Sequence, residues 1–333
     1  MENGIHYHLP ETVSEAVGLL ARHGAAARAL AGGTDLVPAL KLGILGARHL
    51  VSLRRVPGLR DIALDGDRDV VIGALATLRA VATSPLVEHA CAALAEAAGR
   101  TGSPLLRNRG TLGGNVCLDT RCWYFNQSEA WRASRDRCQK AGGARCHVNE
   151  RENRCVALFS ADTPAALMVA GARVELAGPS GMRWIGIEAL YSGEGRAPLA
   201  LAPGEIVTRI RIPKPLAGWR TAYVKHAVRE SIDFPILGVA AGVELAPDGT
   251  IHAARVAVTG ARSAPVRLPE VENAVGGRRL ADVGDGDLAR IATRALGPLF
   301  LSDAVPHKRL LAGLMTVDAL ARAAGEDSGR RRS

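Results

Sequence analysis

Two glycine-rich loops restrict the fold of this 333-residue chain more than any other feature of its sequence. The first has the sequence Ala-Gly-Gly-Thr-Asp-Leu at residues 31–36 and follows a short apolar segment, residues 28–31, which we expect to form a strand. Paired glycines after a strand expose consecutive backbone N–H groups, an arrangement that can cradle a pyrophosphate. Taken alone, the pattern is more often a simple turn, and it lacks the Gly-x-Gly-x-x-Gly spacing of the usual dinucleotide fold.

A second loop of the same kind lies about 80 residues further along the chain. It has the sequence Asn-Arg-Gly-Thr-Leu-Gly-Gly-Asn at residues 108–115 and again combines paired glycines with small hydrogen-bond donors. Two such loops could grip one long dinucleotide, so their joint presence favours a binding site over a pair of turns.

Hydrophobic periodicity predicts helices and strands in mixed order. The expected helices cover residues 12–23, 78–82, 85–98, 164–170, 287–295 and 308–323. The expected strands cover residues 28–31, 50–53, 61–64, 70–74, 173–176, 206–212, 222–227, 238–245 and 254–259. Prolines and glycine at residues 213–219 indicate a domain boundary. A single hydrophobic core rarely extends over a chain of this length, so we expect two domains.

The charge and the termini exclude some classes of function. The net charge is +9, but lysine and arginine are spread along the chain apart from residues 330–332, which predicts no nucleic-acid-binding module. The chain starts without a signal-peptide pattern and has no apolar run of membrane-spanning length, so we expect a cytoplasmic protein with no membrane contact. We expect the polar tail, residues 326–333, to be disordered.

The two loops together resemble the FAD-binding medium subunits of the molybdenum hydroxylases, a family that includes xanthine and carbon monoxide dehydrogenases. The resemblance extends to Ser-Ala-Asp-Thr-Pro-Ala-Ala-Leu at residues 160–167 and to the segment around Lys225, and it covers nearly the whole chain. It implies FAD as cofactor. The residues implied to bind it are Leu30, Ala31, Gly32, Gly33, Thr34, Asp35, Leu36, Thr101, Gly102, Thr111, Gly113, Gly114, Asn115, Asp162 and Lys225.

The same resemblance implies an α+β architecture of two domains. Residues 1–215 would form a two-lobed FAD-binding domain of the vanillyl-alcohol-oxidase (PCMH) type. Residues 220–325 would form a smaller α+β domain of the carbon monoxide dehydrogenase flavoprotein C-terminal type.

Four of the six cysteines lie in a stretch that has little hydrophobic periodicity and that we interpret as an insertion at about residues 117–157. They are Cys122, Cys138, Cys146 and Cys155, separated by 15, 7 and 8 residues. Cytosolic thiols stay reduced, so metal binding is a better use for them than disulfides. Four thiolates suit either zinc or an iron–sulfur cluster; the absence of close Cys-x-x-Cys pairs and the many basic residues nearby favour the cluster.

Ordinary medium subunits lack such a segment, whereas this one resembles the flavoprotein subunit of 4-hydroxybenzoyl-CoA reductases around Arg-Cys-Trp-Tyr-Phe-Asn-Gln-Ser at residues 121–128. That resemblance implies a [4Fe-4S] cluster on the four cysteines. Trp123, Tyr124, Phe125 and Trp131 either wall this site from water or simply pack the segment. Cys91 and Cys117 are expected to be buried small side chains.

By resemblance, the chain is an electron-transfer subunit without catalytic residues of its own. It would act in a heterotrimer, itself dimerised, with a molybdopterin-binding large subunit and a small subunit carrying two [2Fe-2S] clusters. Reduced ferredoxin would supply electrons through the [4Fe-4S] cluster and FAD for reductive dehydroxylation of 4-hydroxybenzoyl-CoA to benzoyl-CoA. Two alternatives remain: the FAD subunit of an oxidising hydroxylase of the xanthine or aldehyde dehydrogenase type, and a non-catalytic zinc-binding scaffold.

Overall fold

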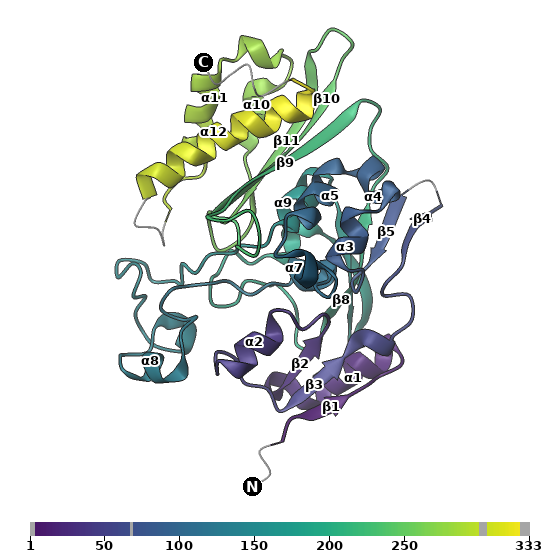
Figure 1. The fold of residues 1–333 in the computed structure, drawn as a ribbon, viewed down its shortest axis with the longest axis vertical. Helices are drawn as coiled ribbons and strands as arrows, with labels where there is room; N and C mark the ends of the chain where they lie inside the picture. The colour runs from purple at the N-terminus through teal and green to yellow at the C-terminus, as the bar shows by residue number, and fades with distance from the viewer. Residues whose placement is uncertain (1–3, 67–68, 300–304, 327–333) are drawn as a thin grey trace.

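The computed structural model describes residues 4–66, 69–299 and 305–326, and its strands form three separate β-sheets (Figure 1). The sheets follow one another roughly in chain order, and helices pack on them and between the second sheet and the third. The arrangement places both glycine loops between the first sheet and the second (Figure 1).

The first sheet is small and parallel, with strand order β1-β3-β2. Its strands are β1 (His6–His8), β3 (His49–Ser52) and β2 (Ala27–Leu30). Helix α1 (Val13–His23) packs on it through its buried apolar face, with Thr12 as N-cap and Gly24 (φ 52°) as C-cap. The predicted helix and its stop at Gly24 are confirmed, while the two predicted strands each begin one residue earlier than expected.

The second sheet is antiparallel, with strand order β4-β5-β8-β6-β7. Its strands are β4 (Ile62–Asp65), β5 (Asp69–Gly73), β6 (Arg173–Gly178), β7 (Gly181–Gly186) and β8 (Ile206–Ile212). The predicted β4–β5 hairpin is confirmed. Strand β7 was not predicted, because its outward-facing residues are largely exposed and give it little apolar alternation.

Helices pack beside this sheet and form the largest buried apolar cluster. They are α3 (Leu78–Ala82), α4 (Pro85–Ala90), α5 (Ala92–Gly99) and α9 (Thr163–Val169). The prediction of one helix over residues 85–98 is wrong: Cys91 has extended backbone angles (φ −161°, ψ 90°) and separates α4 from α5. Both halves are apolar with helical spacing, so the sequence pattern does not mark the break.

The third sheet is antiparallel, with strand order β12-β11-β10-β9. Its strands are β9 (Trp219–His226), β10 (Leu237–Leu245), β11 (Ile251–Thr259) and β12 (Val266–Arg267). Helices α10 (Pro269–Val275), α11 (Asp285–Ala295) and α12 (Val305–Ala324) cover one face, and α5 and α9 pack against the other (Figure 1). The predicted boundary at residues 213–219 forms the connection from β8 to β9.

The remaining helices are short and belong to the loops around the cavity described below. They are α2 (Leu36–Lys41), α6 (Pro104–Arg107), α7 (Leu112–Val116) and α8 (Glu129–Ala133), with 3₁₀ turns at η1 (Gly24–Ala26), η2 (Leu53–Arg55), η3 (Gln139–Ala141), η4 (Ile187–Leu190) and η5 (Leu280–Asp282). Residues 101–115 were expected to be entirely loop, so α6 and α7 are additions to the prediction.

The described residues contain no helix long and apolar enough to cross a membrane. The tail predicted to be disordered lies outside the described residues except for Glu326.

Candidate functional site

The first glycine loop presents a row of free backbone donors. It joins the end of β2 to the start of α2, and Asp35 at the N-cap makes no side-chain capping bond. Within the described part of the chain, the amide N–H groups of residues 32–36 donate to no backbone or side-chain acceptor. Consecutive unpaired amides in a glycine loop can form a concave anion site, and the assignment of this loop to a pyrophosphate stays a prediction.

The second glycine loop lies directly against the first. A Cβ atom added to Gly32 would stand 2.0 Å from the backbone oxygen of Arg109, so residue 32 can only be glycine. Gly110 approaches the Thr34 side chain, because its added Cβ would lie 3.4 Å from Thr34 Oγ1. Two loops separated by more than 70 residues in the chain therefore make one wall.

Thr111 fixes the second loop by capping α7: its Oγ1 accepts a hydrogen bond from the Gly114 N–H at 3.1 Å. Gly113 is buried, and an added Cβ would lie 2.7 Å from both the Cβ and the backbone oxygen of Ala74. Gly114 is exposed and lines the cavity. The paired glycines thus serve different purposes, Gly113 for packing against β5 and Gly114 for access to the backbone.

A cavity of about 650 Å³, which we call the glycine cavity, opens between these loops. Its volume falls in the range typical of cofactor sites. The predicted residues that line it are Ala31, Gly32, Gly33, Thr34, Asp35, Leu36, Thr101, Gly102, Thr111, Gly114, Asn115 and Asp162. Leu30, Gly113 and Lys225 do not line it.

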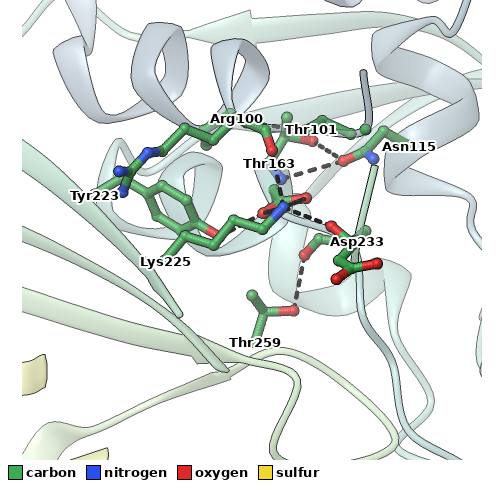
Figure 2. A network of polar contacts seen from close by, with 12 residues as sticks. Arg100, Thr101, Asn115, Thr163, Tyr223, Lys225, Asp233 and Thr259 are labelled. Carbon is green, nitrogen blue, oxygen red and sulfur yellow. Dashed lines mark hydrogen bonds and ion pairs between the residues drawn. The ribbon is translucent and has the colours of Figure 1, made fainter. Parts of the chain in front are cut away.

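Asp162 and Lys225 form a buried ion pair behind this cavity (Figure 2). Lys225 Nζ lies 3.1 Å from Asp162 Oδ1, and the Tyr223 hydroxyl donates to the same carboxylate oxygen at 2.9 Å. Burial raises the pKa of the Asp162 carboxyl, and the positive charge of Lys225 opposes that rise. The pair fixes the Asp162 side chain at the start of α9, at the edge of the cavity.

Lys225 is occupied by protein acceptors. Its ammonium also donates to the backbone oxygens of Arg100 at 2.8 Å and Asp233 at 3.0 Å (Figure 2). Three acceptors use the three donors of an ammonium group. Direct contact between Lys225 and a cofactor stays a prediction. In this structure Lys225 positions the Asp162 carboxylate.

Asn115 is oriented by the same region. Its Oδ1 accepts hydrogen bonds from the Thr163 N–H at 3.1 Å and the Thr163 hydroxyl at 2.6 Å (Figure 2). With the carbonyl oxygen engaged, the amide nitrogen is left to donate elsewhere, and Asn115 lines the cavity.

The segment between β9 and β10 adds cavity residues that the sequence analysis missed: Ile232, Asp233 and Phe234. Ile232 has φ 71°, a conformation that β-branched residues rarely adopt, and its N–H donates to the backbone oxygen of Gly102 at 3.0 Å. The flanking Ser231, Asp233 and Pro235 are common in turns, but isoleucine at position 232 gave no signal of the left-handed conformation there.

Arg121 links this segment to the first loop and to the cysteines. Its guanidinium forms an ion pair with Asp35 and lies over the Phe234 ring, 4.2 Å from the ring centroid. Burial raises the pKa of the Asp35 carboxyl, and the Arg121 charge opposes the rise. Arg121 directly precedes Cys122, so the mouth of the glycine cavity adjoins the insertion.

The four predicted cluster cysteines lie in residues 117–157, which we call the cysteine segment. The segment includes α8 and projects from the sheets (Figure 1). Cys138, Cys146 and Cys155 are buried, and Cys122 is half-buried. Burial raises the pKa of the Cys122 thiol, with Cys138 and Cys146 adding to the rise. Burial also raises the pKa of Cys155 to about 11, with Cys122 and Cys146 adding to it, so the four thiols are near neighbours.

The sulfur atoms of these cysteines are not gathered at the separations of a metal-loaded zinc site. In a tetrahedral zinc–thiolate site the sulfur atoms stand about 3.8 Å apart. Among the described residues, no three cysteine sulfur atoms lie within 4.8 Å of one another. In a cubane cluster each thiolate binds a different iron atom, so a wider quartet is required.

Lys140 anchors the cysteine segment to the rest of the protein. Its buried ammonium donates to Asp119 Oδ1 at 2.8 Å, Thr120 Oγ1 at 2.7 Å and the Gly195 backbone oxygen at 2.9 Å. Its charge also acts on the Cys155 thiol and opposes the rise in that pKa. Lys140 is thus one basic residue that acts on the cysteines, and the wider basic shell stays a prediction.

The aromatic residues of the segment divide into two kinds. Phe125 is buried, with Arg132 and Lys140 over its ring, while Trp123 is 76% exposed and walls nothing from water. Tyr124 and Trp131 contact each other at 6.2 Å between ring centroids.

Comparison with known proteins gives two family matches that together span nearly the whole chain. The family model described as the FAD binding domain in molybdopterin dehydrogenase matches residues 3–215. The model described as the CO dehydrogenase flavoprotein C-terminal domain matches residues 222–323.

Individual relatives agree with these matches. The carbon monoxide dehydrogenase medium chain of Hydrogenophaga pseudoflava is 31% identical over 76% of this chain and 73% of the relative. The aldehyde oxidoreductase FAD-binding subunit PaoB of Escherichia coli K12 is 33% identical over 79% of this chain and 83% of the relative. A structure of the Hydrogenophaga pseudoflava carbon monoxide dehydrogenase superposes with a TM-score of 0.78 at 28% identity, covering 98% of each chain. The expected α+β fold, with its two-part family architecture, is confirmed.

Proposed function

This chain belongs to the FAD-binding medium subunits of the molybdenum hydroxylases, and on that premise we propose that it carries FAD and a [4Fe-4S] cluster in a reductase of the 4-hydroxybenzoyl-CoA type. In this role the chain transfers electrons and binds no organic substrate. Substrate chemistry belongs to another subunit.

Hydrogen-bonding groups that line the glycine cavity support the assignment of FAD to it. The free amides of residues 32–36 face a cavity in which the cofactor's pyrophosphate would accept hydrogen bonds. Asn115 would offer its oriented amide nitrogen, and Asp162 a carboxylate oxygen toward the cofactor's sugar hydroxyls. Bound FAD would supply the exchange between two-electron and one-electron transfer.

The observation that carries the finer assignment is the convergence of the four thiols in the cysteine segment. Three of them are buried, they affect one another's pKa, and no three of their sulfur atoms lie within 4.8 Å of one another. Cys122, Cys138, Cys146 and Cys155 would hold the cluster. Lys140 and the arginines of the segment would offset its negative charge.

The partners follow from the family. We propose a complex with a molybdopterin-binding large subunit and a small subunit carrying [2Fe-2S] clusters, with reduced ferredoxin as the electron donor. The exposed arginines of the cysteine segment would attract an acidic donor protein.

The test is the visible spectrum of the anaerobically purified chain, together with iron and acid-labile sulfide per flavin. We expect about four irons and four sulfides per FAD. Cys138→Ser should remove the iron and leave the flavin, whereas Cys91→Ser, which alters a buried cysteine outside the segment, should retain both.

Each other result has a definite meaning. FAD without iron would assign the chain to an oxidising hydroxylase of the aldehyde or xanthine dehydrogenase type. A colourless protein that binds zinc would leave only the scaffold interpretation. If the iron is present, turnover of 4-hydroxybenzoyl-CoA with reduced ferredoxin by the assembled complex tests the substrate.

A further inference from the structure

Three histidines from separate elements meet at the edge of the first sheet, far along the chain from the cysteines. His8 ends β1, His23 ends α1 and His49 begins β3. One ring nitrogen from each lies within 4.8 Å of the others, and His8 Nε2 is 3.0 Å from His49 Nδ1. Among the described residues this is the only group of three or more potential metal ligands with such close atoms.

The fold dictates this meeting. In the parallel sheet His6 is in register with His49 and His8 with Val51, and residues two apart on a strand share one face, so both histidines lie on the face of the sheet that carries His49. Helix α1 packs on β2 and β3 and ends at His23, which brings its ring onto that of His49 at 3.7 Å between centroids. His6 also stacks on His49, at 5.0 Å.

The chemistry of the group suits a borderline transition-metal ion. All its ligand atoms are imidazole nitrogens, and the group contains no carboxylate, so hard ions such as Ca²⁺ and Mg²⁺ are poor occupants. His23 stands at the C-terminus of α1, where the helix dipole favours positive charge.

The geometry needs only side-chain adjustment. Zinc with nitrogen ligands at about 2.1 Å in a tetrahedron sets those nitrogens about 3.4 Å apart. One pair is already closer than that, and the others lie within 4.8 Å. His23 and His49 are stacked face to face, so one ring must turn to aim its lone pair at a shared ion. All three rings are half-buried at the surface, so there is room for one ring to rotate.

We propose that His8, His23 and His49 bind one divalent transition-metal ion of the zinc class, with His6 or water in the fourth position. The ion joins β1, α1 and β3 at a single point. Because β2 of the same sheet runs directly into the first glycine loop, the ion stabilises the lobe that carries the free amides. The role is structural and independent of the iron–sulfur assignment.

The test compares the zinc content of wild-type and variant proteins. Each is the full chain, purified anaerobically with its cofactors and then washed with EDTA. Wild-type protein, His23→Gln, His49→Gln and His89→Gln are titrated with Zn²⁺ and dialysed, and zinc per chain is measured. His89 is an exposed histidine on α4 and serves as the matched control. We expect one zinc per chain in wild type and His89→Gln, its loss from the other two variants, and a zinc-dependent rise in Tm only where zinc binds.

Two results would overturn the proposal. One is equal zinc content in all four proteins, which would place any bound zinc elsewhere. The other is a Co²⁺-substituted wild-type protein whose only cobalt signal is thiolate-to-metal charge transfer, since a histidine site gives ligand-field bands without it. Circular dichroism of the metal-free variants separates loss of a ligand from loss of fold.

Discussion

The glycine cavity and the cysteine segment adjoin each other at Arg121, yet they are held in place by different means. Strands and helices whose side chains form the main core frame the cavity, and its two loops touch through backbone at Gly32 and Arg109. The cysteine segment has only α8, one 3₁₀ turn and isolated bridges, and it depends on polar anchors such as Lys140. One site is shaped by packing and the other by a few charged contacts.

This contrast indicates which interactions keep each site folded. Packing in a core exists without any ligand, so the cavity should persist in the apoprotein. A segment with few buried apolar contacts opens at low free energy unless something else ties it together. The cysteine segment should therefore respond to metal and to salt far more than the cavity does.

The strongest test of the packed site is Gly32→Ala. The added Cβ would overlap the Arg109 backbone oxygen at 2.0 Å, so the loops must separate. We expect a loss of at least about 4 kcal/mol in the free energy of unfolding and loss of bound flavin. Urea denaturation and the flavin absorbance of the purified protein measure both.

The control for that change is Gly18→Ala, in the middle of α1, where an added Cβ meets nothing within 4 Å. It should raise stability by roughly 0.5–1 kcal/mol and leave flavin content unchanged. Equal tolerance of both substitutions would show that the cavity is not shaped by the contact between its loops.

Lys225→Met tests the buried pair at the cavity edge. Removing the ammonium leaves the Asp162 carboxylate buried without its partner, which should cost about 3 kcal/mol. The pKa of Asp162, already raised by burial, should then rise further. Between the carboxyl's unfolded and folded pKa values the native variant binds more protons, so its stability relative to wild type falls as pH rises from 5 to 7.

Denaturation of wild type and Lys225→Met at pH 5, 6 and 7 measures this difference. The double variant Asp162→Asn/Lys225→Met lacks the lone charge and should recover part of the stability and lose the added pH dependence. A Lys225→Met protein with the pH profile of wild type would contradict the buried pair.

Lys140→Met tests the anchored site. It removes three hydrogen bonds, two to Asp119 and Thr120 at the start of the cysteine segment and one to Gly195 outside it, and we expect a local effect of about 2 kcal/mol. Hydrogen exchange should speed up in residues 117–157 while the sheets stay protected. Lys214→Met, at an exposed lysine between β8 and β9, is the control; global destabilisation without faster local exchange would argue against a separately ordered segment.

The smallest expected effect concerns the surface of the segment. Arg137→Gln with Arg151→Gln removes two exposed charges, and we expect a threefold to tenfold slower electron uptake from reduced ferredoxin at low ionic strength, roughly 1 kcal/mol. Stopped-flow rates at several salt concentrations measure it, with Arg294→Gln on α11 as the matched change. Rates independent of salt in wild type would refute electrostatic steering.

The sequence predicted the glycine loops well because their chemistry is local. A strand, a glycine pair and a small donor specify backbone exposure within six residues, and nearly all the predicted loop residues line the cavity. The four cysteines were likewise identified as candidate metal ligands from their residue type and position alone.

Other features depended on tertiary contacts that no local pattern records. Cys91 breaks a helix whose halves both look helical, and the Lys225 ammonium is occupied by three protein acceptors and does not itself line the cavity. The proximity of His23 to His49 follows only from the packing of α1 on the first sheet. Ile232 and Phe234 reach the cavity through a turn whose left-handed residue is an isoleucine.

Ile232 shows what the cavity demands of the sequence around it. A branched side chain in the left-handed region costs about 1–2 kcal/mol, and asparagine would adopt the same backbone at less cost. An engineer who selects substitutions for heat resistance alone would replace this residue first. That choice would exchange an apolar side chain at the cavity wall for a polar one, so thermostabilisation of this protein should be screened by flavin retention as well as by melting temperature.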